Sequence, residues 1–145
     1  MVNGAVLTVV DPASATGHEQ WLAAHGRTPQ REPHSHPNYC KAVAVDEAKI
    51  RCAVWQEPSG QVMMPFELRT IQSAQLGTDY SDAVTPYGYG GAFVTGVVDE
   101  HAFWSAWHAW CPRENVVGLL VRGSLFLGQT LEVSPHAVVS YPNVV

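Results

Sequence analysis

The chain has 145 residues, of which 46% are hydrophobic and only 14% are charged, and its net charge at pH 7 is −5. Its 10% aromatic content is too high for a disordered chain, and its eight scattered lysines and arginines form no basic stripe, which argues against a stand-alone nucleic-acid-binding domain. Since soluble domains carry about 25% charged residues, the low charge predicts either a large core or a surface covered by a partner.

The apolar start of the chain, residues 1–10, predicts a short strand or an extended arm. No basic region precedes it, as a secretory signal would require. No segment reaches the roughly 18–20 apolar residues that span a bilayer, so we expect no membrane span. Three cysteines without a CxxC spacing favour reduced thiols and a cytoplasmic protein.

Two helices are expected next, at residues 18–24 and 38–47, and the proline-rich segment 28–37 between them predicts a loop. Residues 50–56 and 61–71 then predict an antiparallel hairpin. In its first strand the alternation places Ile50, Cys52 and Val54 on one face. Pro65 within the second strand indicates an edge position or a bulge.

The second half of the chain begins with a long irregular segment, 72–96. Asp99 is a plausible N-cap for a helix over 100–111, whose three tryptophans predict core packing, or core packing together with a partner groove. The apolar run 116–121 predicts a central strand. Short strands at 131–133 and 137–141 complete an α/β (α+β) fold, with helices packed on a mixed sheet.

Few residues point directly to chemistry. His34 and His36 form an HxH pair that could bind zinc or copper, but their proline-rich setting favours solvated loop histidines, and we expect no metal. His101 and His108 share one helical face, where a surface role is favoured over catalysis. Cys40, beside a lysine, is the only thiol to consider as a nucleophile. No phosphate-binding or dinucleotide-binding motif occurs.

The segment 82–93 is the most informative one. Pro86 fixes its own φ angle, the glycines permit tight turns, and Tyr87 and Tyr89 each present a ring and a hydroxyl group. Such a loop can line a polar pocket for a peptide-like or sugar-like ligand. It can equally be a rigid crossing whose tyrosines cap the core, and the residues alone do not decide between the two.

The motif D-A-V-T-P-Y-G-Y-G-G (82–91), the helix reading F-W-S-A-W-H-A-W-C and the strand that ends in V-R resemble the N-terminal half of FemAB-like acyltransferases. Upstream, H-P-x-Y (36–39) and M-P-F-x-L-R (64–69) are also similar, so the resemblance covers about residues 20–145. It implies that residues 1–145 form a single GNAT-like domain with a mixed, mostly antiparallel sheet, the first of two such domains in the family.

The function that the resemblance implies is transfer of an aminoacyl group from aminoacyl-tRNA to an amine of a peptidoglycan precursor or specialised metabolite, without a cofactor. No catalytic residue is assigned. The candidate contacts to a small peptide-like or amine acceptor are Tyr39, Lys41, Arg69, Tyr87, Gly88, Tyr89 and Arg122.

The chain departs from the family pattern in four respects, one of which is Pro112, which interrupts a helix end that usually continues with charged residues. Ala92 replaces a common proline, and Arg122 is followed by G-S-L-F where relatives commonly read F-H-P-L. The resemblance covers only the first of the family's two domains, so a partner chain with a second GNAT-like half, or a homodimer, is expected, and tRNA contact is expected only through that partner. The alternatives are a non-catalytic binding or scaffold module and, less favoured, an acyl-CoA-dependent enzyme, since no Q/R-x-x-G-x-G/A loop opens a helix.

Overall fold

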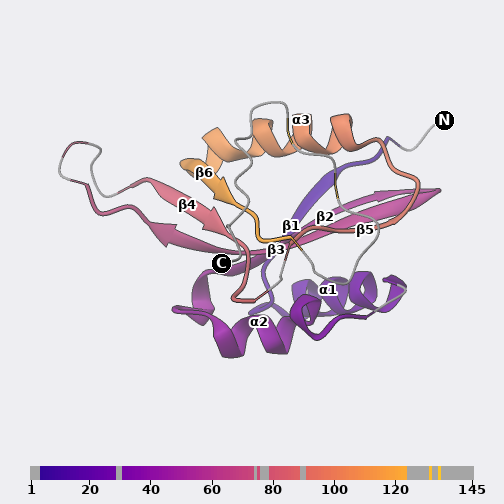
Figure 1. The fold of residues 1–145 in the computed structure, drawn as a ribbon, viewed down its shortest axis with the longest axis horizontal. Coiled ribbons are helices and arrows are strands. Elements are labelled where there is room, and N and C mark those ends of the chain that lie inside the picture. The colour runs from indigo at the N-terminus through magenta and orange to yellow at the C-terminus, as the bar shows by residue number, and fades with distance from the viewer. Residues whose placement is uncertain are drawn as a thin grey trace, which may run out of the picture.

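A six-stranded sheet carries helices on both of its faces (Figure 1). The computed structural model describes residues 4–28, 31–73, 75, 79–88, 91–123, 131 and 134. The strands are β1 (Leu7–Val10), β2 (Ile50–Glu57), β3 (Gly60–Thr70), β4 (Ser81–Val84), β5 (Phe93–Gly96) and β6 (Val116–Leu120), and the helices are α1 (Ala15–Arg27), α2 (Pro37–Val43) and α3 (Glu100–Trp110). The predicted mixed, mostly antiparallel sheet with packed helices is confirmed.

The predicted hairpin is the centre of the sheet, because β2 and β3 pair antiparallel from Ile50 opposite Glu67 to Glu57 opposite Gly60. The predicted face of β2 is also confirmed. Ile50, Cys52 and Val54 all pack in one buried cluster with residues of α1 and α2. Figure 1 shows these two helices on the same side of the sheet.

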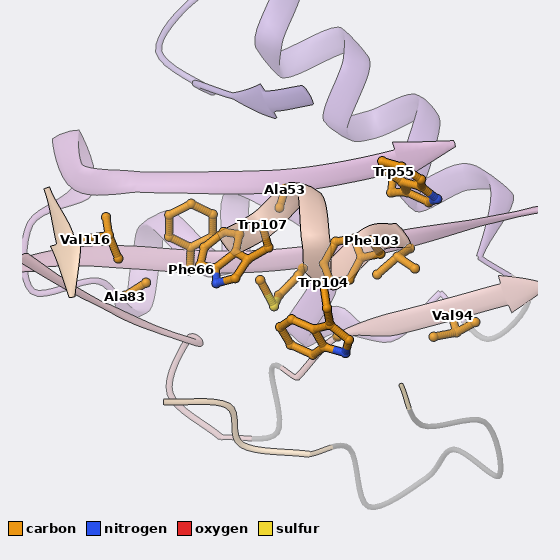
Figure 2. Packing of buried hydrophobic residues seen from close by; sticks show 12 residues of the cluster. Ala53, Trp55, Phe66, Ala83, Val94, Phe103, Trp104, Trp107 and Val116 are labelled. Carbon is orange, nitrogen blue, oxygen red and sulfur yellow. The ribbon is translucent and has the colours of Figure 1, made fainter. Parts of the chain in front are cut away.

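Helix α3 covers the opposite face of the sheet, and its tryptophans are core residues (Figure 2). Trp104 and Trp107 are buried, and the Trp107 ring lies 5.2 Å from Phe66 of β3 and stacks at 5.1 Å on the ring of Trp110. Edge-to-face and offset ring pairs of this kind stabilise a core beyond the area they bury. The aromatic richness of this helix is therefore largely explained by the sheet that it covers.

One edge of β3 is shared between two short strands. β4 pairs with Glu67–Thr70 and β5 pairs with Gly60–Met63, while the described residues between them, 85–88 and 91–92, lie outside the strands. Pro65 lies in the gap, where the described strands give β3 a partner, β2, on one side only. The edge position predicted for this proline is confirmed, since proline has no N–H to donate to a second neighbour.

The prediction of an irregular segment over 72–96 is wrong, because this range contains β4 and β5. Each of these strands has four residues, too few to show a period without the partner strand β3. The predicted central position of residues 116–121 is also wrong: β6 pairs only with β4 among the described residues, and Val117 and Leu120 are 57% and 52% exposed. An apolar run therefore marked a terminal strand of the described sheet.

The helix boundaries differ from prediction for local reasons. Helix α1 begins at Ala15 because the Ser14 hydroxyl accepts a hydrogen bond from the Gly17 N–H. Helix α2 ends at Val43, and Asp46 caps a separate 3-10 turn over Glu47–Lys49. Apart from Leu131, the strands predicted after β6 lie outside the described residues. In the part of the chain that the structure describes, no helix is both long and apolar enough to cross a membrane.

Candidate functional site

The Tyr-Gly loop, defined here by the described residues 85–88 and 91, begins at the carboxyl end of the sheet's one described parallel pair. β4 and β6 run in the same direction, with Val84 opposite Leu120 at the ends of the two strands. In open sheets that contain parallel strands, ligands commonly bind outside the carboxyl ends of those strands. The sheet topology therefore places the loop where a ligand site is expected.

Thr85 anchors the loop to the end of β6. Its side chain is fully buried, and its backbone N–H donates to the Leu120 carbonyl at 3.0 Å. Its hydroxyl oxygen accepts from the Arg122 N–H at 2.9 Å, and its carbonyl oxygen accepts from Arg122 Nη1 at 3.2 Å. All three polar groups of Thr85 are thus used to hold β6 and Arg122.

Tyr39 of α2 holds the far side of the loop. Its hydroxyl donates to the Tyr87 carbonyl at 3.2 Å, and its ring meets the His34 ring edge-on at a centroid distance of 5.0 Å. Gly88 has a φ of +90°, which L side chains rarely adopt, and a Cβ there would lie 3.1 Å from His34 Cδ2. The loop therefore crosses closely over α2, while the Tyr87 side chain is 75% exposed.

Gly91 brings the end of the loop back against β6. A Cβ at this position would lie 2.6 Å from the Arg122 carbonyl oxygen, which is too close for any side chain. Both ends of the described loop are therefore packed on the segment that follows β6, at Thr85 and at Gly91. The close approach at the second of these two points explains why residue 91 is a glycine.

Histidines support the α2 side of the site. His36 Nδ1 accepts from the Asn38 N–H and caps α2, and His25 Nδ1 lies 2.8 Å from the Ser35 hydroxyl. The rings of His25 and His36 are 5.0 Å apart. Burial, followed by the nearby His36 and Arg31, lowers the pKa of His25. The prediction that His34 and His36 are solvated loop histidines is wrong, because His36 caps α2 and the His34 ring packs on Tyr39.

The described residues contain no group of three or more His, Cys, Asp or Glu that could hold a metal ion. His101 and His108 are both exposed on α3, as a surface role predicts.

The thiols are poorly suited to nucleophilic chemistry. Burial raises the pKa of Cys40 to about 12 and that of Cys111 to about 11, and it raises the pKa of Cys52 as well. Cys40 is therefore dropped as a candidate nucleophile.

Four of the residues expected to contact an acceptor lie in the loop or bond to it: Tyr39 bonds to Tyr87 and lies next to Gly88, and Arg122 bonds to Thr85 at the start of the loop. Among the described residues, no contact joins the other two described candidates to the loop. The Lys41 ammonium donates to the Pro12 carbonyl at 3.3 Å, and Arg69 pairs with Glu67 at 3.4 Å. The remaining candidate, Tyr89, lies outside the described residues.

Two residues of this arrangement were missed from the sequence. Thr85 was not singled out, because the partner of its hydroxyl group, Arg122, lies 37 residues away in the sequence and no local pattern marks the contact. His34 was considered only as a metal ligand or a solvated histidine, and nothing in the local sequence indicates that Gly88 packs on it.

Comparison of the chain with protein-family models, with curated proteins and with solved structures finds no match. The family resemblance consequently stands on the motifs alone, and the geometry of the Tyr-Gly loop and the chemistry of its residues are the remaining evidence on function.

Proposed function

We propose that this chain is the acceptor-binding half of a FemAB-like aminoacyltransferase. It would act with a second GNAT-like half, or as a homodimer, in transferring an aminoacyl group from aminoacyl-tRNA to an amine of a peptidoglycan precursor or specialised metabolite. One observation carries the proposal. Four residues that the resemblance implies as acceptor contacts, from three distant parts of the sequence, belong to the Tyr-Gly loop or are bonded to it: Tyr87 and Gly88 lie in the loop, Tyr39 bonds to Tyr87, and Arg122 bonds to Thr85.

The chemistry of the loop is compatible with this reaction. An amine attacks an activated ester, which requires positioning, help with deprotonation and a donor for the developing oxyanion, but neither a metal nor a covalent nucleophile. The exposed Tyr87 side chain and the Arg122 guanidinium supply a hydroxyl and N–H donors. The high pKa values of the buried thiols do not matter for such a mechanism.

The beginning of α3 argues for an aminoacyl donor over acyl-CoA. Helix N-termini bind the diphosphate of such cofactors through free N–H groups and a positive dipole end. Here the Asp99 carboxylate accepts from the Ala102 N–H at 2.9 Å, and the Glu57 carboxylate accepts from the Asp99 N–H at 2.9 Å. With Glu100 in the first turn as well, this helix start repels a diphosphate.

A ligand-binding module without activity is the second candidate. In the contacts between described residues, no carboxylate bonds to residues 85–88, so no general base for the attacking amine is identified. Such a module would use the same loop and bind the same class of ligand. Binding and turnover must therefore be measured separately.

The binding test uses the full chain and a lysine-containing peptidoglycan stem peptide, compared with the same peptide acetylated on its ε-amine. We expect calorimetry to detect the free-amine peptide only, and Tyr87→Ala to weaken its binding about fivefold to tenfold, the worth of one hydrogen bond. Tyr80→Ala is the matched control, because Tyr80 is also an exposed tyrosine but has no described contact with the loop. Equal binding of both peptides, or equal losses in both variants, contradicts the proposal.

Turnover is tested by adding radiolabelled aminoacyl-tRNA to the full chain and the free-amine peptide, together with a chain that supplies a second GNAT-like half. Label transferred to the peptide supports the transferase, whereas binding without transfer supports the second candidate.

A further inference from the structure

The guanidinium of Arg122 carries a positive charge that no described carboxylate neutralises. Within the described residues, the ion pairs are Arg51 with Asp11 at 3.5 Å and Arg69 with Glu67 at 3.4 Å. Arg122 is partly buried at the edge of the Tyr-Gly loop and takes part in neither. A partly buried arginine normally gains a carboxylate or other anionic partner, because desolvation of an unpaired charge is costly.

The position of this guanidinium is fixed. The Arg122 backbone N–H is bonded to the Thr85 hydroxyl, and Nη1 is bonded to the Thr85 carbonyl, while Thr85 itself is fully buried. Only one of the five guanidinium N–H groups is used in these contacts. The remaining donors keep the planar fork that binds a carboxylate or phosphate through two parallel hydrogen bonds.

We infer that Arg122 binds an oxyanion, a carboxylate or a phosphate, of the acceptor molecule. The inference rests on the proposed function and adds a substrate class to it: the acceptor carries an anionic group in addition to the reacting amine. Because a guanidinium repels an ammonium group, the amine lies at a different end of the molecule from the group that Arg122 holds. An amino acid, a peptide carboxyl terminus or a phosphorylated amine fits this requirement.

The experiment follows the backbone amide and arginine side-chain signals of the full chain by NMR while small probes are added. N-acetylalanine is compared with its neutral amide for the carboxylate, and glycerol 3-phosphate is compared with glycerol for the phosphate. We expect an anionic probe to shift the signals of Arg122 and Thr85, and its neutral counterpart to leave them unchanged. The probe that binds more tightly identifies the source of the oxyanion.

Variants then assign the binding to the side chain. Arg122→Gln should weaken the anionic probe about tenfold to a hundredfold, since a hydrogen bond to a charged group is lost, and Arg122→Lys should retain part of the affinity because it keeps the charge without the fork. Arg113→Gln removes an exposed arginine beyond α3 and should have no effect. Circular dichroism of each variant shows whether it is folded. If Arg122→Gln does not fold, the affinity of Arg122→Lys for the anionic probe is compared with that of the unmodified chain instead.

The inference is overturned if the neutral probes bind as well as the anionic ones, or if Arg122→Lys and Arg113→Gln alter anion binding equally. The free-amine stem peptide distinguishes this result from failure of the proposed function. Amine-dependent binding that is insensitive to Arg122 rejects the oxyanion contact and leaves the acceptor site standing. Binding of an anionic probe that depends on Arg122, without any amine-dependent binding, supports the oxyanion contact and rejects the proposed function.

Discussion

Replacing Thr85 with valine should loosen the attachment between the Tyr-Gly loop and β6. Valine has nearly the same shape as threonine but lacks the hydroxyl oxygen that accepts the Arg122 N–H at 2.9 Å. Leaving a buried donor without a partner costs about 1–3 kcal/mol. Because this hydrogen bond is only partly buried, the lower half of that range applies. We expect a loss of about 1–2 kcal/mol in the free energy of unfolding, or about 4–8 °C in Tm.

Thr85→Ser is the matched control, since it keeps the hydroxyl and removes only a methyl group. Urea unfolding of both variants gives the free energies, and amide exchange of Arg122 reports the particular hydrogen bond. Faster exchange at Arg122 in Thr85→Val, but not in Thr85→Ser, is the expected result. If the serine variant loses as much stability as the valine variant and both keep the Arg122 amide protected, the packing of the methyl group matters and the reasoning from the hydroxyl is refuted.

Two further predictions concern the α2 side of the site. Gly88→Ala should cost about 1–3 kcal/mol, because alanine must adopt a φ of +90° and its Cβ meets His34; unchanged urea unfolding would contradict the geometry of the loop. The free energy of unfolding should decrease as the pH falls through 6.5, because the pKa of His25 is lower in the folded than in the unfolded chain and the unfolded chain takes up the proton first. His25→Gln should reduce this decrease between pH 7 and pH 5, and a decrease that persists in full in this variant assigns it to other groups.

Helices and strands whose apolar residues recur at a clear helical or strand spacing could be predicted from the sequence. The alternation in β2 and the spacing of aromatic residues in α3 each report burial against one surface, so both elements and their buried faces were predicted correctly. Strands β4 and β5 could not be found in this way, because four residues carry too little of a pattern. Their identity depends on β3, which offers one edge to both of them.

In the candidate site, too, the features with a local sequence pattern could be predicted, and those that depend on distant residues could not. The Tyr-Gly loop was identified from its own composition, since glycine, proline and tyrosine in one short segment are informative without any partner. The hydrogen bonds that attach the loop to the rest of the fold could not be identified from the sequence. The Tyr39–Tyr87 hydrogen bond joins residues 48 apart in sequence, and the Arg122–Thr85 bond joins residues 37 apart. Only the arrangement of the strands reveals such pairs.

The parallel pairing of β4 with β6 has a consequence for the order of folding. The hairpin of β2 and β3 is local in sequence, whereas β6 returns to β4 only after α3 has been made, and pairings between distant segments form slowly. We therefore expect the nascent chain to form the β2–β3 hairpin and helices α1 and α2 before Arg122 reaches Thr85. Ligand recognition would then be acquired late in synthesis, so a chain that is still being made presents a folded sheet but no competent loop.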